Sequence, residues 1–373
     1  MPQSDLDAIA ELARTVARKV IDPRAEEIDR SHEFPADIAK ALFESGLLTA
    51  VIPEQYGGGS IGMLEVATIA RELAWADVSS TMIFTLQATC FSVIATLGSP
   101  EQQETLFGRA LAGELISLGL TEPGAGSDAR SVTTRAETVD DGYKINGLKH
   151  YITNARAAGV ILVIAKTDDG ISAFAVDREA PGIKITRNEM KMGLHGTSTD
   201  ELLFEDVVVP ASARLGSGDA GFAALMRALE RGRVSIAAVA VGMARRCIAE
   251  AAEHLSARKQ FGQLLKDFQG LQFILADMEI GTSAADALVM SAAAEQVGTP
   301  VFRSLSAQAK SFATDNAMKV TTDAVQLFGG AGYMQGFVVE RMMRDAKILQ
   351  IFEGTNQIMR QLIARDVFRR IAG

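Results

Sequence analysis

The chain has few of the residues that build metal centres, disulfide frameworks or nucleic-acid surfaces. It contains two cysteines, Cys90 and Cys247, and four histidines among 373 residues. Neither cysteine belongs to a CxxC pair or has a histidine at ligand spacing, so we expect no metal site and no disulfide framework. Lys and Arg number 37 against 46 Asp and Glu, a formal net charge of -9. With no long basic run, this balance argues against nucleic acid or an anionic membrane as partner.

Long hydrophobic runs are also missing. The N-terminal stretch lacks the continuous apolar segment of a signal peptide, and no uninterrupted apolar run reaches the length that spans a bilayer. We therefore expect a cytoplasmic protein without a membrane partner. Hydrophobic residues make up 48% of the chain. At this length, that content is enough for two or three subdomains.

Helical periodicity dominates both ends of the chain. Apolar residues recur every three to four positions, and a cap residue or a leading proline precedes many of the segments. The predicted N-terminal helices cover residues 6–20, 35–48, 63–75, 79–97 and 100–111. After Gly216 the predicted helices cover residues 220–255, 269–295, 302–328, 338–348 and 357–371. Their length and alanine content are typical of a packed bundle.

Short β-branched runs lie between the two helical parts. The predicted strands cover residues 132–139, 143–145, 148–153, 160–166, 171–176, 183–187 and 202–209. Asp141-Gly142 and Asn146-Gly147 are typical of hairpin turns, which favours a small antiparallel β domain. We therefore predict a mainly α fold with a middle β domain. Its boundaries are residues 1–113, 114–214 and 215–373.

Two polar segments are candidates for ligand binding. In TEPGAGSD, residues 121–128, two glycines beside Ser127 leave backbone N–H groups free to turn toward an anion. The segment lacks the third glycine and the strand-turn-helix context of a dinucleotide fingerprint, and it could be a simple loop. Tyr151 and Thr153 are two apart on a predicted strand and so share a face, which suits a stacked heterocycle or a core tyrosine.

Glu353 is the most unusual charged residue. It follows an apolar stretch that ends in Ile351 and Phe352, and it precedes the turn Gly354-Thr355-Asn356. Burial against an apolar wall raises the pKa of a carboxyl toward neutrality, as a general base requires. A solvated helix end beside a C-terminal glycine explains the same pattern.

Taken together, a series of motifs resembles the acyl-CoA dehydrogenase family, in its short-chain, butyryl-like branch. In chain order they are TEPGAGSD, YITN (151–154), KMGLHGTSTDELLFEDVVVP (191–210), ARKQFG (257–262) with FQ, QLFGGAGY (326–333) and RDAKILQIFEGTNQI (344–358). The resemblance runs from Leu6 to Phe368. It implies an N-terminal helical domain, a β-barrel-like middle domain, a C-terminal four-helix bundle, FAD as cofactor, and a homotetramer built as a dimer of dimers.

The resemblance also implies a cofactor role for each matching residue. Contacts to the flavin ring or the pyrophosphate would come from Leu118, Thr121, Gly126 and Ser127. Tyr151 would flank the ring, and Thr153 would donate a hydrogen bond near flavin N5. Thr355 and Gln357 would contact FAD too. The ADP half of an FAD bound mainly to a neighbouring subunit would be held by Arg258, Gln260, Phe261, Gln269, Gln326 and Gly330.

For the substrate, the resemblance implies an acyl-CoA thioester held by Ser127, Arg233 and Gly354, with Arg233 against CoA or its pantetheine arm. Glu353 would remove the α proton while the β hydrogen leaves as hydride to N5, which gives a trans-2-enoyl thioester. An electron-transfer flavoprotein would then accept the electrons. Such a reaction belongs to fatty acid metabolism and β-oxidation.

Isovaleryl-type and long-chain-type relatives carry their base immediately before the matched Arg233. Here that position is Gly232, and Glu230 points elsewhere on the helix, so Glu353 keeps the role. Phe352 and His195 replace the Tyr and Arg that are usual in the family.

The segment from Thr85 to Phe91, with Gln87 and Cys90, is expected to line the acyl pocket and favours a short or branched chain. Other functions stay open. They are an acyl carrier protein-linked acyl dehydrogenase, an acyl-CoA oxidase of a biosynthetic pathway, and a non-catalytic FAD-binding or assembly protein.

Overall fold

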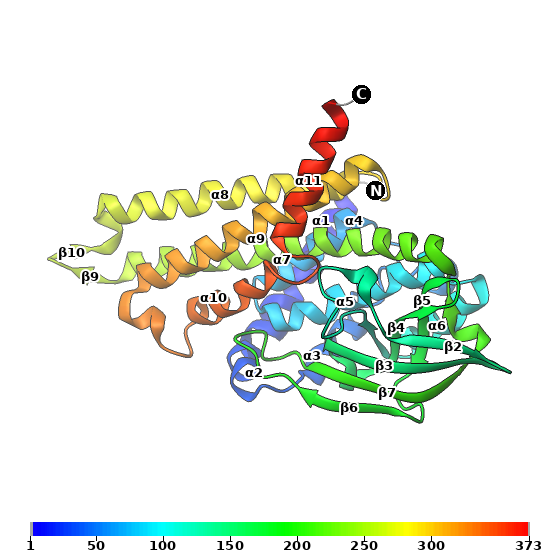
Figure 1. The fold of residues 1–373 in the computed structure, drawn as a ribbon. Helices are drawn as coiled ribbons and strands as arrows, with labels where there is room; N and C mark the ends of the chain where they lie inside the picture. Colours follow the sequence, from blue (N-terminus) through cyan, green and yellow to red (C-terminus); the bar gives the residue numbers. More distant parts are fainter. Residues whose placement is uncertain (1–2, 372–373) are drawn as a thin grey trace.

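The computed structural model describes residues 3–371 and confirms a mainly α fold with a middle β domain (Figure 1). The N-terminal helices are α1 (Gln3–Val16), α2 (Ala25–Ser31), α3 (Ala36–Glu44), α4 (Met63–Ala74), α5 (Val78–Leu97) and α6 (Pro100–Leu111). The C-terminal helices are α7 (Gly218–Ala257), α8 (Gln269–Ala294), α9 (Pro300–Phe328), α10 (Val338–Leu349) and α11 (Asn356–Ile371).

The middle domain is one twisted sheet of eight strands within the described residues. The sheet strands are β1 (Leu115–Gly119), β2 (Arg135–Val139), β3 (Gly142–Thr153), β4 (Ala158–Thr167), β5 (Gly170–Asp177), β6 (Ile183–Asn188), β7 (Thr199–Pro210) and β8 (Arg214–Leu215). Their order is β6-β7-β3-β2-β4-β5-β8, with β1 paired to β4. Because β1 and β2 run parallel to β4, the prediction of a purely antiparallel domain is wrong.

The predicted hairpin at Asn146-Gly147 is also wrong. β3 passes straight through these residues, and its pairing with β7 shifts register between Ile145 and Gly147. A Cβ on Gly147 would lie 2.4 Å from Thr134 Oγ1, so this position is a bulge that needs glycine because a neighbouring segment approaches closely.

The two helical parts share one hydrophobic core. The long helices α7, α8 and α9 pack against one another, α10 and α11 pack on α9, and α4 and α5 pack on α7 (Figure 1). A Cβ on Gly242 would lie 2.1 Å from the carbonyl oxygen of Arg71, so α4 and α7 approach to backbone contact there. This packing fixes α5 and α7 relative to each other.

Helix α5 is long and apolar enough by length and composition to span a membrane. Of its apolar window, however, 89% is buried inside the protein, as in the core helix of a soluble protein. The β domain packs on one side of α5, and α7 packs on another. Helix α5 therefore forms one wall of a pocket beside the β domain.

Candidate active site

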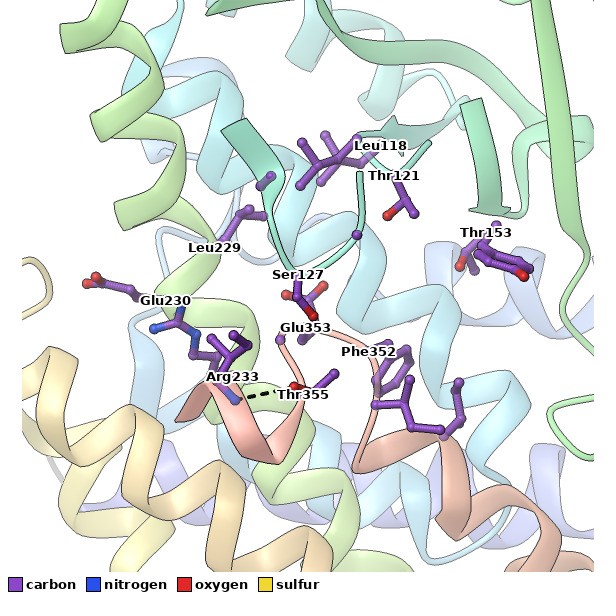
Figure 2. A pocket seen from close by; sticks show the side chains of 18 of the residues that line it. Leu118, Thr121, Ser127, Thr153, Leu229, Glu230, Arg233, Phe352, Glu353 and Thr355 are labelled. Carbon is purple, nitrogen blue, oxygen red and sulfur yellow. Dashed lines mark hydrogen bonds between the residues drawn. The ribbon is translucent and has the colours of Figure 1, made fainter. Parts of the chain in front are cut away.

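A pocket of about 1330 Å³ lies where α5, the β domain, α7 and the segment between α10 and α11 meet. Figure 2 shows side chains from these elements converging on it. The structure brings together ten of the residues singled out in the sequence: Leu118, Thr121, Gly126, Ser127, Tyr151, Thr153, Arg233, Glu353, Gly354 and Thr355.

The remaining predicted site residues lie elsewhere on the chain. Arg258 directly follows α7. Gln260 and Phe261 belong to the hairpin of β9 (Lys259–Gln260) and β10 (Gln263–Leu264), and Gln269 is the first residue of α8. In Figure 1 this hairpin lies far from the β domain. The Phe261 side chain is 94% exposed. Outside the pocket lining are also Gln326, Gly330 and Gln357.

A buried ion pair holds the TEPGAGSD loop against the sheet. Glu122 accepts hydrogen bonds from Lys149 Nζ (2.7 Å), from the backbone N–H of Thr133 (2.6 Å) and from that of Thr134 (2.9 Å). Lys149 Nζ also donates to the carbonyl of Leu120 at 3.1 Å. Both side chains are almost fully buried. This pair was not predicted from the sequence, although a lysine within a predicted strand was a signal for it.

Glu353 occupies a strained turn. Its φ is 54° and that of Gly354 is 89°, so two successive residues lie in the left-handed region. This conformation costs free energy for a residue with a side chain and is common at active sites. At the φ of Gly354 any residue with a side chain would be strained, so glycine is favoured beside the glutamate.

Lys310 holds this turn from α9. Its fully buried Nζ donates to the Gly354 carbonyl at 2.8 Å and to Asn356 Oδ1 at 2.9 Å. The Asn356 side-chain amide in turn donates to Thr314 Oγ1 (2.9 Å) and Asp315 Oδ1 (2.8 Å). Lys310 and Asn356 could not be singled out from the sequence, because their contacts join separate helices.

The charges around Glu353 act in opposite directions. Burial raises the pKa of its carboxyl, whereas the positive charges of Arg233 and Lys310 lower it. Burial lowers the pKa of Lys310 to about 8. In residues 3–371 no hydrogen bond reaches the Glu353 carboxylate, so it is free to act on a ligand.

Gly232 provides the space that the Glu353 carboxylate occupies. A Cβ on Gly232 would lie 2.9 Å from Glu353 Oε2 and 3.2 Å from its Cδ. Glu230 also lines the pocket, but it pairs with Arg303 at 2.7 Å and extends away from Glu353 (Figure 2). Gly232, the position before Arg233, therefore lies directly beside the Glu353 carboxylate.

The expectation for the acyl-pocket segment is only partly right. Leu86 lines the pocket, but Gln87, Cys90 and Phe91 do not. Gln87 exchanges two hydrogen bonds of 2.9 Å with the backbone of Ile116, and Phe91 packs on Phe107. These residues lie on the face of α5 that is turned to β1 and α6. They therefore do not support the expectation of a short or branched acyl chain.

Comparison with known proteins decides the family. The chain matches models of the acyl-CoA dehydrogenase N-terminal domain over residues 3–114, the middle domain over 117–207 and the C-terminal domain over 219–368. This chain belongs to the acyl-CoA dehydrogenase family. The family's FAD-dependent oxidoreductase chemistry therefore applies to it.

Several members of the acyl-CoA dehydrogenase family are similar over nearly the whole chain. A cyclohex-1-ene-1-carbonyl-CoA dehydrogenase of Geobacter metallireducens is 43% identical over 95% of this chain and 96% of its own. Butyryl-CoA dehydrogenase of Megasphaera elsdenii is 38% identical over 98% of both chains, with a TM-score of 0.94. A chain from a structural study of the electron transferring flavoprotein of Acidaminococcus fermentans is 39% identical over 98% of both chains, with a TM-score of 0.95.

The pocket residues fit the FAD of an acyl-CoA dehydrogenase. Tyr151 is 59% exposed, and one face of its ring stacks on His150 with the ring centroids 3.9 Å apart, which leaves the other face for a ligand. Thr121, Ser127 and Thr153 supply hydroxyl groups, and a Cβ on Gly126 would meet nothing within 4 Å, so a ligand can approach the backbone there. In the described part of the chain, no group of three His, Cys, Asp or Glu side chains is placed to hold a metal ion.

We predict that Lys310→Met moves the pH profile of flavin reduction to higher pH, as expected if Glu353 is the base. A base works only when ionised, so the rate of flavin reduction by an acyl thioester should rise with pH through the raised pKa of Glu353. Removing the Lys310 charge raises that pKa further and moves the midpoint of the profile to higher pH. Stopped-flow reduction across pH measures the shift.

Lys319→Met is the matched control, because Lys319 lies on the same helix, exposed and paired with Asp323 at 2.7 Å. Its pH profile should match that of the wild type. A Lys310→Met profile with an unmoved midpoint would show that Lys310 does not act on the base.

Proposed function

We propose that this protein oxidises an acyl-CoA thioester to the trans-2-enoyl thioester, with Glu353 as the base. The observation that carries the proposal is the Glu353 carboxylate, which faces the pocket without a hydrogen-bond partner in residues 3–371. Burial that raises its pKa suits removal of a weakly acidic α proton. FAD bound in the same pocket would accept the β hydrogen together with its electron pair.

The thioester carbonyl needs a donor directed at the enolate oxygen that develops during proton removal. Across residues 3–371, the backbone N–H of Glu353 forms no hydrogen bond within the chain, which leaves it available for that oxygen. The strained turn held by Lys310 would fix both this N–H and the carboxylate. The base and the carbonyl donor would thus belong to one rigid residue.

Arg233 would bind the CoA part of the substrate. Its Nε and Nη1 are buried and lack a hydrogen-bond partner within the described chain. Unpaired N–H groups at a pocket wall favour a ligand that supplies acceptors, such as the amide carbonyls of pantetheine. Ser127 and Gly354, also in the lining, would contact the thioester end.

A neighbouring subunit would complete the FAD site in a homotetramer. The β9–β10 hairpin joins α7 to α8 and lies far from the β domain of its own chain (Figure 1). Arg258 immediately precedes this hairpin, and Phe261 at its turn is exposed. We predict that Arg258→Ala weakens FAD binding by about tenfold, since a hydrogen bond to a charged group contributes roughly 1.5–3 kcal/mol. Titration of the apoprotein with FAD measures the affinity, and Lys266→Ala, in the turn that follows the hairpin, is the control.

Unchanged FAD affinity in Arg258→Ala would contradict a contribution of this hairpin to a neighbouring site. Analytical ultracentrifugation of both variants should give the mass of a tetramer. A monomer in the wild-type protein would contradict the proposed assembly.

The reduced enzyme would pass its electrons to an electron-transfer flavoprotein. This proposal is supported by the similarity to a chain from the Acidaminococcus fermentans study, which concerns such a protein. The test of the overall function is anaerobic bleaching of the flavin by a panel of acyl-CoA and acyl carrier protein thioesters, followed by reoxidation with electron-transfer flavoprotein or with oxygen. A protein that binds no FAD, or whose flavin no thioester reduces, would contradict the proposal.

A further inference from the structure

A second ring, the imidazole of His150, lies behind the Tyr151 side chain and outside the lining of the large pocket. The two rings are stacked, with their centroids 3.9 Å apart and their planes inclined by 14°. Successive side chains of a regular strand point to opposite faces of the sheet, so neighbours in the sequence do not stack. An irregularity of β3 must therefore bring these two rings to the same side.

The irregularity is a β-bulge. The pairing of β3 with β7 shifts register between Lys149 and Ile152. There, His150 and Tyr151 of β3 together oppose the single residue Glu201 of β7. Tyr151 has a φ of 59°, in the left-handed region, which costs free energy for a residue with a side chain. Bulges and backbone strain of this kind are common beside ligand sites, where they redirect a side chain.

Contacts on both sides of the bulge hold it in place. The backbone N–H of His150 donates to the Thr121 carbonyl at 2.8 Å, which ties the bulge to the TEPGAGSD loop. At the ring edge, His150 Nε2 lies 2.9 Å from Glu189 Oε1, and Arg187 Nε donates to the same oxygen at 2.7 Å. These hydrogen bonds lower the pKa of the Glu189 carboxyl. An ionised carboxylate only accepts, so Nε2 carries a proton, and rotation of the imidazole would break this bond.

Tyr151 and Glu189 line the pocket, and His150 contacts both of them from outside the lining. The imidazole is mostly buried and covers one face of the Tyr151 ring, so the opposite face is the one left for a ligand. A ring that is already held on one face loses less conformational freedom when a planar group stacks on the other. The stack therefore prepares Tyr151 for a planar ligand.

We propose that His150 is a positioning residue for FAD: held by Glu189, it fixes the ring face that Tyr151 presents to the flavin. The inference rests on the proposed function, with the flavin ring against Tyr151. Without the imidazole, Tyr151 would be free to turn, and its contact with the flavin would loosen. The electron-rich face of a tyrosine opposes the negative charge that a flavin gains on reduction, so looser stacking should make the flavin midpoint potential more positive.

The experiment separates the ring of His150 from its hydrogen bond. His150→Phe keeps a ring without the bond to Glu189, and His150→Gln keeps a donor without a ring. In the holoprotein, His150→Gln should release FAD about two- to tenfold faster, the range that one aromatic pair supplies. It should also lengthen the flavin fluorescence lifetime, because a tyrosine held against a flavin quenches its emission. His150→Phe should stay close to the wild type in FAD release, lifetime and midpoint potential.

The controls bracket these effects. Tyr151→Leu should give the longest lifetime. Tyr143→Leu should match the wild type, because Tyr143 lies on the same strand and pairs with Phe174 at 5.1 Å outside the pocket lining. Melting temperature shows that each variant is folded, and His150→Leu is a second variant without a ring should His150→Gln fail to fold.

The outcomes distinguish this inference from the proposed function. Wild-type lifetime and FAD release in His150→Gln, beside a changed Tyr151→Leu, would overturn the inference alone. Equal effects of His150→Phe and His150→Gln would assign the effect to the hydrogen bond and overturn the role of the stack. An unchanged lifetime in Tyr151→Leu would show that the flavin does not lie against this ring, which also overturns the inference. Failure of the proposed function appears separately, as a flavin that no acyl thioester reduces.

Discussion

Glu353→Gln should lower the rate of flavin reduction by its best acyl thioester by about a thousandfold, the range expected for loss of a general base. The amide keeps the size and hydrogen-bonding capacity of the carboxylate but cannot accept the α proton. The side chain forms no hydrogen bond in residues 3–371, so the substitution should leave folding and FAD content nearly unchanged. Stopped-flow bleaching under anaerobic conditions measures the rate, and the flavin spectrum confirms occupancy.

Glu230→Gln is the matched control, since Glu230 is a second carboxylate in the same pocket lining. Its carboxylate forms an ion pair with Arg303 at 2.7 Å, and its side chain extends away from Glu353 (Figure 2). Glu230→Gln should lower the rate of flavin reduction far less than Glu353→Gln does. If Glu230→Gln abolished reduction and Glu353→Gln did not, the base would be assigned to the wrong residue.

Lys149→Met should lower the free energy of unfolding by about 3–5 kcal/mol, as expected when one partner of a buried ion pair is removed. Glu122 would remain buried in the TEPGAGSD loop, and of the hydrogen bonds that its carboxylate accepts in residues 3–371, those from Thr133 and Thr134 would remain. The loop would then lose its fixed position, and we expect weaker FAD retention. Denaturant unfolding and FAD release measure the two effects.

The double variant Lys149→Met/Glu122→Gln removes the stranded charge and should recover part of the lost stability. Lys144→Met on the same strand is the control, because Lys144 is half-exposed and lies 3.7 Å from Asp206. A Lys149→Met protein as stable as the Lys144→Met protein would contradict the role of the pair.

Acid should weaken the ion pair between Glu122 and Lys149 in the wild-type protein. Hydrogen bonds from Lys149 and the threonines outweigh burial and lower the pKa of Glu122 from 4.5 to about 2. A carboxyl with a lowered pKa stabilises the folded state fully above its unfolded value. That contribution is therefore lost as pH falls from 4.5 toward 2.

The sequence motifs predicted the helical and β regions and the residues that gather at the pocket, because each motif is contiguous and supplies several neighbouring contacts. Glu353 could be singled out since an isolated charge beside an apolar stretch is visible without a structure. Strand alternation predicted that Tyr151 and Thr153 share a face, and both line the pocket. It did not predict the irregularity there: Tyr151 has a φ of 59°, and the pairing of β3 with β7 shifts register between Lys149 and Ile152.

Other features depend on distant packing and could not be predicted. Asn146-Gly147 has the composition of a hairpin, yet Thr134 approaches so closely that a bulge forms there. Gln87 and Phe91 lie on α5 as expected, but the position of β1 decides which face of that helix meets the pocket. Lys310 reaches Gly354 across a gap of 44 residues in the chain.

Exchange of the α proton tests the central claim most directly, because it isolates proton removal from electron transfer. The substrate is an acyl-CoA thioester whose β carbon carries no hydrogen, incubated with the FAD-loaded enzyme in deuterated water and followed by mass spectrometry. The wild type should incorporate deuterium at the α carbon, and Glu353→Gln should incorporate none above the rate in buffer. Incorporation by Glu353→Gln at the wild-type rate would contradict the assignment of Glu353 as the base.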